Sequence, residues 1–366
     1  MTDGAERGSL EKAPSLVVFF GTYDSSAHPR VQVLVDGLTA SGCEVIELNR
    51  SLDFDTASRV QVARQPWRAP ALLWRIMRAW WGLRRDARSL MDRLDKRAID
   101  LVVVGYLGQF DVHLASRLFD APVALDYLVG MGSTAGDRGS RPWVAGVLAW
   151  IDRRAVTAAD IVVVDTAAQA ALCPSPTEPV VVPVGAPDRW FHDSSSATSV
   201  GLSVVFFGLY TPLQGAPYIG DAIAELADRD DIRFTMIGSG QERIECERRA
   251  GTTAHRVNWI DWLDPDDLAA EVARHDVCLG IFGTTPKTRR VVPNKVYQGA
   301  AAGCAVVTSD TPPQRAVFRD AAILCRAGDG GALADALARL ADDPVELREK
   351  RRAARALAET FRPYAV

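Results

Sequence analysis

The sequence predicts an α/β protein made of two Rossmann-like domains that face each other across a cleft. Short apolar runs alternate with helical stretches along the chain, which is typical of parallel sheets covered by helices on both faces. The order of strand, glycine and loop at residues 17–23 recurs at residues 204–210. The chain has 366 residues, whereas single hydrophobic cores stop growing at about 250–300 residues.

Six apolar runs in the first half are interpreted as strands. The first run ends at a glycine turn, and the helix predicted after it, residues 28–41, stops at Gly42 because glycine accepts the left-handed conformation of a helix C-cap. Longer helices are predicted over residues 66–97 and 142–159. The six strands are residues 16–21, 45–48, 101–105, 123–126, 161–165 and 180–183.

The second half repeats this alternation after a polar, low-complexity linker at residues 193–200. Strands are expected at residues 204–210, 234–238, 257–260, 277–281 and 305–308, and helices at 331–341 and 345–361. The predicted division is a disordered leader at 1–15, a first domain at 16–192, the linker, a second domain at 201–344, and a C-terminal helix at 345–366 that crosses back to the first domain.

The composition excludes several classes of protein. The net charge of −4 lacks the basic excess of a nucleic-acid binder. None of the six cysteines stands in a CxxC or CxxH pair, which argues against a zinc site and favours reduced thiols in a cytoplasmic protein. The polar first fifteen residues are unlike a signal peptide, and no uncharged apolar run reaches the length of about 18 residues that a membrane span needs.

Two glycine-containing loops follow strands of the second half, at residues 208–215 and 238–240. Glycine lets a backbone approach a phosphate closely, and the following helix offers free N–H groups and the positive end of its dipole. Each glycine pair alone also fits an ordinary turn of an α/β protein.

A third loop is strongly basic. Lys287, Arg289, Arg290 and Lys295 place four cations within nine residues at a predicted helix start between two buried strands. One arginine can donate two parallel hydrogen bonds to phosphate oxygens, and lysine acts as a point charge. This loop therefore suits a pyrophosphate. The alternative interpretation is a solvated basic loop.

The stretch from Lys287 to Asp310 resembles the nucleotide-sugar-binding segment of family 4 (group 1) glycosyltransferases. The resemblance extends over nearly the whole chain, because the two glycine loops match the donor loops of that family and Asp276-Val277 matches its usual Asp-Val pair. It implies a GT-B fold in which the domain at 16–192 binds the acceptor and the domain at 201–344 binds the nucleotide-sugar donor. It also implies transfer of a sugar with retention of configuration, with no bound metal and no cofactor. The matching residues are Pro293, Gln298, Ala301, Gly303, Val306, Val307, Ser309 and Asp310.

The sequence departs from this family at four places. Arg290 and Gln298 stand where the family has two glutamates eight positions apart, and Leu209 and Gln214 stand where it usually has arginine and lysine. We therefore hypothesise that Arg289, Arg290 or Lys295 neutralises the phosphates, and that Gln298 holds the ribose. The predicted donor-binding residues are Gly208, Gln214, Gly238, Gly240, Arg289, Arg290, Asn294, Lys295 and Gln298.

In the first domain, Gly21, Asp24 and His28 follow the first strand, so they are expected to face the cleft. Asp126 ends a strand close to the place of the cleft histidine or aspartate of the family. It is the candidate catalytic residue, through contact with the sugar or the acceptor hydroxyl. A helix or turn cap is an equally good interpretation of this aspartate.

The helix predicted over residues 66–97 combines tryptophans with nine Lys or Arg and three Asp. This combination suits an anionic membrane surface or a lipid-linked acceptor, while a core helix with an arginine-rich solvent face is the plainer alternative.

The predicted activity is transfer of a sugar from a nucleotide-diphosphate sugar to a glycan, lipid-linked or small-molecule acceptor. A sugar-nucleotide epimerase of the same fold and a catalytically silent binding subunit remain as alternatives. A dinucleotide-dependent dehydrogenase is a weaker one, since no GxGxxG follows either first strand.

Overall fold

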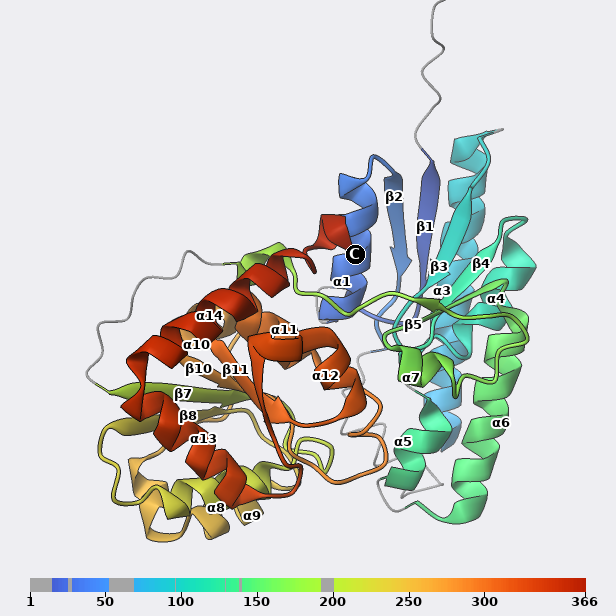
Figure 1. Cartoon of the computed structure of the whole chain (residues 1–366). Coiled ribbons are helices and arrows are strands. Elements are labelled where there is room, and N and C mark those ends of the chain that lie inside the picture. Colours follow the sequence, from blue (N-terminus) through green and yellow to red (C-terminus); the bar gives the residue numbers. More distant parts are fainter. Residues whose placement is uncertain are drawn as a thin grey trace, which may run out of the picture.

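The computed structural model describes residues 15–25, 28–52, 69–95, 97–128, 130–137, 140–191 and 201–366. These residues form two parallel six-stranded sheets, one in each half of the chain, with helices packed against them (Figure 1). The predicted α/β fold with two Rossmann-like halves is confirmed. The predicted leader, apart from residue 15, and the predicted linker at 193–200 lie outside the described residues.

The first sheet has the strand order β2-β1-β3-β4-β5-β6. The order reverses between β1 and β3, because the chain moves outward from β1 to β2 and then returns to the other side of β1. In open α/β sheets this switch point, at the carboxyl ends of the strands, is where ligands bind. The strands are β1 (Leu16–Gly21), β2 (Glu44–Asn49), β3 (Leu101–Val104), β4 (Val123–Asp126), β5 (Ile161–Val164) and β6 (Val180–Val181).

Helices cover both faces of the first sheet. Helix α1 (Pro29–Ala40) packs on the face that contains Val17 and Phe19, and the other face carries α3 (Ala69–Leu94), α4 (Asp111–Leu118) and α6 (Pro142–Ala158). Two shorter helices, α5 (Met131–Asp137) and α7 (Ala167–Ala170), follow β4 and β5.

The second sheet has the order β12-β11-β10-β7-β8-β9, and its switch point lies between β7 and β10. Its edge strand β12 was not predicted, because a four-residue apolar run is equally consistent with a buried helix segment. The strands are β7 (Leu202–Phe207), β8 (Ile232–Ile237), β9 (Asn258–Ile260), β10 (Val277–Leu279), β11 (Ala305–Ser309) and β12 (Ala322–Cys325).

The helices of the second half form two hydrophobic layers around this sheet. One layer contains α8 (Ala216–Glu225), α9 (Arg243–Ala250) and α13 (Gly330–Asp342). The other contains α10 (Pro265–Val272), α11 (Asn294–Ala301) and α14 (Pro344–Glu359), together with the end of α12 (Pro312–Phe318). The cores come from alternate residues of the same strands, so each sheet is buried on both faces.

Two segments tie the halves together. Val184, Ala186 and Trp190 come from the first half but pack in the core of the second, where the Trp190 ring stacks on Phe207 at 5.4 Å between centroids. At the other end of the chain, α14 leads into a 3-10 turn, Pro363–Ala365, which packs against α1 of the first half (Figure 1). The chain therefore crosses between the halves twice.

Candidate active site

The loops after β7 and β10 interlock at the switch point of the second sheet. Gly215 has a left-handed φ of 64°, and a Cβ atom there would lie only 2.3 Å from the backbone nitrogen of Gly283. Thr288 Oγ1 donates to the carbonyl of Leu213 at 3.4 Å. The residues that precede α8 and those that precede α11 therefore form one continuous surface at the carboxyl ends of the strands.

Lys295 is a buried cation at this surface. It stands in the first turn of α11, it is 5% exposed, and its Nζ lies 3.7 Å from the centroid of the Phe206 ring. Its ammonium donates to Gln214 Oε1, and a Cβ atom at Gly208 would lie 3.2 Å from Nζ. The structure thus brings together three of the predicted donor residues, Gly208 and Gln214 of the loop after β7 and Lys295 of α11.

The charge of Lys295 is uncompensated in the part of the chain that the structure describes. No carboxylate there forms an ion pair with it, and burial holds the pKa of its ammonium well below the ordinary value for lysine. A buried ion without an opposite charge costs several kcal/mol. An anion bound beside Gly208 and the start of α11 would offset this cost, because α11 also presents its positive dipole end, with no side-chain cap, at the same place.

The predicted donor glycines are required by the packing of the loops. A Cβ atom at Gly238 would lie 2.1 Å from the carbonyl oxygen of Gly208, and one at Gly240 would lie 2.8 Å from the nitrogen of Tyr210. Gly208 and Gly238 also have φ angles of 138° and 112°, which favour glycine. These positions therefore hold two loops in close contact, whatever ligand the loops bind.

The remaining basic residues of the third loop face the first domain. Lys287 Nζ donates to Thr134 Oγ1 at 3.0 Å, and Thr166 Oγ1 donates to the backbone carbonyl of Arg290 at 2.8 Å. Arg289 is exposed, whereas Arg290 is half-buried. Two cations of the loop are thus at the boundary between the domains, and the third lies on the surface.

A cavity of about 180 Å³ lies at this boundary. Pockets for drug-sized ligands occupy about 300–1,000 Å³, so this cavity is smaller than a site for a ligand of that size. The lining residues are Leu128, Gly130, Ser133, Gly136 and Gln169 of the first half and Lys287, Arg290 and Val291 of the second.

Asn294 and Gln298 occupy the first two turns of α11, on either side of Lys295. Asn294 is the first residue of the helix and is half-buried, while Gln298 is buried. Their predicted contacts with the donor remain predictions.

The predicted cleft residues of the first domain lie at its own switch point. The His28 ring stacks on Tyr106, which follows β3, with 3.8 Å between centroids. Next to it, Thr22 donates its backbone N–H and its hydroxyl to Asp111 Oδ2 at 2.7 and 2.8 Å. Gly21 is needed there because a Cβ atom would lie 2.6 Å from the Tyr23 ring. Asp24 is exposed.

Asp126, the candidate catalytic residue, is buried beside Arg30, and its catalytic role remains a prediction. Its side chain is 1% exposed, and its Oδ1 accepts from Nε and Nη2 of Arg30, each at 3.4 Å. Arg30 also donates to the carbonyl of Pro183. Burial raises the pKa of Asp126, and the Arg30 guanidinium opposes that shift. Asp126 is therefore the partner of a buried arginine.

A second buried carboxyl group, Asp165, follows β5 at the same edge. Burial raises its pKa to about 6 although Arg30 and Lys287 act in the opposite direction, and its Oδ1 has no hydrogen-bond partner among the described residues. The buried hydroxyl of Tyr297, on α11 of the other half, likewise lacks a partner among them. The next residue, Thr166, caps the following helix, because its side-chain oxygen accepts a hydrogen bond from the backbone nitrogen of Gln169.

We expect Asp165→Asn to flatten the dependence of stability on pH. A carboxyl group whose pKa is raised from 3.8 to about 6 in the folded state stabilises the fold below pH 4 and loses that contribution as the pH rises to 6. The loss amounts to roughly 3 kcal/mol. The variant should therefore gain stability relative to the wild type between about pH 4 and 7, measured by urea unfolding across this range. Asp266→Asn, at an exposed carboxylate, is the control; equal pH profiles for all three proteins contradict the prediction.

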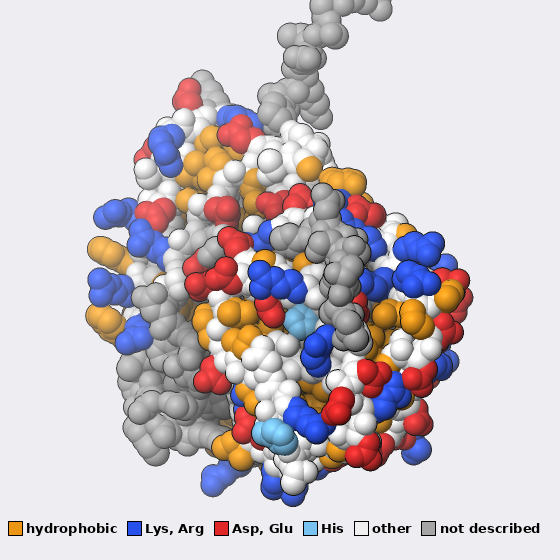
Figure 2. All heavy atoms as spheres, turned by 90° about the vertical axis from the view of Figure 1, so that its left-hand side faces the viewer, with side chains coloured by type: hydrophobic (Ala, Val, Ile, Leu, Met, Phe, Trp, Pro, Cys, Tyr) orange, Lys and Arg blue, Asp and Glu red, His pale blue; other side chains and the backbone are white. Residues whose placement is uncertain are grey.

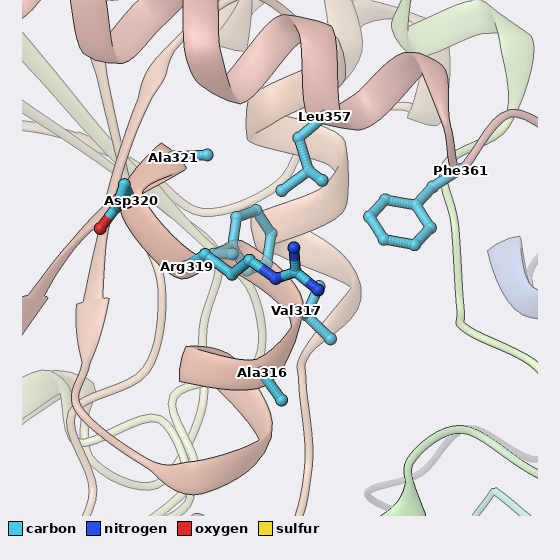
Figure 3. A pocket seen from close by; sticks show the side chains of 8 residues that line it. Ala316, Val317, Arg319, Asp320, Ala321, Leu357 and Phe361 are labelled. Atoms are coloured by element: carbon cyan, nitrogen blue, oxygen red, sulfur yellow. The ribbon is translucent and has the colours of Figure 1, made fainter.

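Another cavity, of about 500 Å³, lies between the end of α12 and α14 (Figure 3). Its lining is mostly apolar, with the Arg319 side chain extending across it beside Val317 and Leu357. None of its lining residues belongs to the predicted donor set, so we do not place a substrate there. Among the described residues, no three His, Cys, Asp or Glu side chains are grouped as metal ligands are.

Comparison with known proteins places the second domain in a family. Residues 201–343 match the family described as "Glycosyl transferases group 1". No curated protein sequence matches the chain.

Solved structures with the same architecture include glycosyltransferases. Sucrose-phosphate synthase from Thermosynechococcus elongatus is 15% identical with a TM-score of 0.69, covering 95% of this chain and 94% of that one. An α,α-trehalose-phosphate synthase (UDP-forming) from Burkholderia vietnamiensis is 14% identical with a TM-score of 0.66, covering 97% and 95%. Anabaena HepE in complex with UDP is 13% identical with a TM-score of 0.62, covering 95% of each chain. The chain thus has the GT-B fold, and residues 201–343 of its second half match the group 1 glycosyltransferase family.

Proposed function

We propose that this protein is a glycosyltransferase that transfers a sugar from a nucleotide-diphosphate sugar, with a UDP-sugar as the first candidate donor. The observation that carries the proposal is the buried, uncompensated Lys295 beside Gly208 and Gln214, at the switch point of a group 1 glycosyltransferase domain. UDP is the nucleotide named for several proteins of the same fold, including HepE and the trehalose-phosphate synthase.

The proposed donor pose follows from the charges. The pyrophosphate lies against Lys295 and the start of α11, and the sugar extends toward the boundary where Lys287 and Arg290 stand. Gln298, one turn further along α11, is the proposed partner of the ribose hydroxyls, since an amide both donates and accepts hydrogen bonds. Leu209 is half exposed and adds no charge, so Lys295 replaces the cations that the glycine loop lacks.

We further propose that the reaction retains the anomeric configuration and proceeds without a bound metal. The bond between the anomeric carbon and the β-phosphate oxygen breaks, and the acceptor oxygen bonds to the same face of that carbon. The acceptor proton passes to an oxygen of the departing diphosphate. Lys295, Arg290 and the dipole of α11 supply fixed positive charge where negative charge develops, which is electrostatic preorganisation. Because the boundary cavity is small, opening and closing of the domains accompany each turnover.

Ligand-induced stabilisation tests the donor assignment. Thermal unfolding is followed with UDP, GDP, ADP and TDP and with their glucose conjugates. A ligand at 100 times its Kd stabilises by about 2.7 kcal/mol, so a UDP-selective rise in Tm is expected. No stabilisation by any nucleotide overturns the proposal.

Product analysis then separates the candidate activities. The protein is incubated with the stabilising donor and a set of sugar and lipid-linked acceptors, with and without EDTA, and products are examined by NMR. A new glycoside with the anomeric configuration of the donor supports the proposal, and activity in EDTA supports metal independence. Conversion of the donor to its epimer without acceptor identifies an epimerase. Donor binding with neither product identifies a binding subunit.

A further inference from the structure

Helices α3 and α6 expose large hydrophobic side chains at helical spacing. On α3 these are Trp74, Met77 and Trp81, and on α6 they are Trp143, Val147 and Trp150. Every one of the six is more than half exposed. Positions three, four and seven residues apart lie on one side of a helix, so each set forms a stripe. Together with the exposed arginines described below, these residues are called the α3–α6 surface.

Both stripes lie on the same side of the first domain and toward its carboxyl edge. Helices α3, α4 and α6 all pack on one face of the first sheet, and α4 contacts both of the others. The exposed tryptophans stand before or at the middle of each helix, since α3 runs from residue 69 to 94 and α6 from residue 142 to 158. Each helix runs back toward the start of a strand, and its first half therefore lies at the edge that faces the cleft (Figure 1).

The stripes are surrounded by cations. On α3, Arg78, Arg84, Arg85 and Arg88 are exposed, and no ion pair is formed by any of them with the described residues. The acidic residue among them, Asp86, is already paired with Arg50 at 2.7 Å. The α6 stripe is bounded by the exposed Arg141, Arg153 and Arg154. The guanidinium carbons of Arg78 and Arg154 lie 5.6 and 6.0 Å from the rings of Trp74 and Trp150. In Figure 2, basic and hydrophobic side chains alternate along the left edge, which is the side of the molecule on which α3 lies.

This chemistry fits the interface of an anionic bilayer better than water or a protein core. Exposed tryptophans are costly in water but favourable at the level of lipid headgroups, where their amphipathic rings are enriched. Arginine near an anionic membrane surface contributes about 1 kcal/mol each. A core helix with an arginine-rich solvent face would bury its tryptophans, whereas Trp74 and Trp81 are exposed. No described helix is long and apolar enough to cross a bilayer, so contact through this surface is peripheral.

We propose that the α3–α6 surface docks on a membrane that contains anionic lipids, with the tryptophans at headgroup depth and the arginines against the lipid phosphates. This goes beyond donor binding and does not depend on it. Docking in this orientation turns the cleft edge of the first domain toward the bilayer.

Vesicle sedimentation tests the proposal with the full chain. Vesicles of phosphatidylcholine alone are compared with vesicles that also contain phosphatidylglycerol, at low and high salt. Binding is expected only with phosphatidylglycerol and is expected to weaken in salt. The variants Trp74→Ser/Trp81→Ser, Trp143→Ser/Trp150→Ser and Arg84→Gln/Arg85→Gln should each reduce binding by about tenfold or more. The matched controls, Trp262→Ser and Arg348→Gln/Arg352→Gln, change exposed residues of the second domain and should bind as the wild type does.

Three results overturn the proposal. The first is no binding to phosphatidylglycerol vesicles at low salt. The second is equal binding by the α3–α6 variants and the controls. The third is analytical ultracentrifugation that finds a wild-type dimer and monomeric tryptophan variants, because the surface is then an interface between two copies of the chain. Far-UV circular dichroism and the UDP-induced rise in Tm establish that each variant is folded. The rise in Tm also shows whether UDP binding is retained, so that loss of vesicle binding is not confused with failure of the donor assignment.

Discussion

Replacing Lys295 with methionine is expected to weaken nucleotide binding by about 10- to 100-fold, because a hydrogen bond to a charged group contributes about 1.5–3 kcal/mol. The same variant is expected to be more stable than the wild type in the absence of ligand. Methionine has a similar length, removes the ammonium of a residue that is 5% exposed and forms no ion pair with the described residues, and keeps the contact with the Phe206 ring. Isothermal titration with UDP and urea unfolding measure the two effects.

A fall in nucleotide affinity together with a rise in stability distinguishes a ligand-binding lysine from a structural one. Lys350→Met is the control, since Lys350 Nζ donates to the carbonyl of Asp320 away from the switch point. Arg290→Ala tests the second proposed cation separately. Unchanged nucleotide affinity in Lys295→Met, or loss of affinity together with loss of stability, would contradict the assignment.

Replacing Arg30 with methionine is expected to destabilise the first domain by about 3–5 kcal/mol, because it leaves the buried Asp126 without its opposite charge. The guanidinium supplies two donors to Asp126 Oδ1 and another to the carbonyl of Pro183. The double variant Arg30→Met/Asp126→Leu removes both charges, so it should recover most of the lost free energy of unfolding. Urea denaturation monitored by circular dichroism gives these values.

The same series tests the assignment of Asp126 as a partner of Arg30. Asp126→Asn keeps the shape of the side chain but removes its charge. A stable Asp126→Asn protein that binds UDP normally and has lost turnover would support the predicted catalytic role of Asp126. A loss of stability with turnover per folded molecule retained agrees with the ion pair.

The sequence by itself determined the architecture and the location of the ligand-binding edge. Continuous apolar runs such as those at residues 16–21 and 202–207 form strands that are buried on both faces, and glycines at their ends mark the turns toward the cleft. The basic stretch around Lys295 was also predicted as a donor loop, because several cations at a helix start between two buried strands suit an anionic ligand. These signals are local, so the chain order alone reveals them.

The tertiary structure decided which charged groups meet. Arg30 and Asp126 are 96 residues apart, and Lys295 and Gln214 are 81 apart. Asp126 looked like a cleft residue because it ends a strand, yet α1 places Arg30 over it. Asp165 and Tyr297 approach each other only because two domains pack together, and the helices that carry the exposed tryptophans, α3 and α6, are brought to the same face of the first sheet by its strand order. The local sequence determines at which edge of a sheet a side chain lies. How deeply that side chain is buried, and which charged group it meets, depend on packing between distant segments.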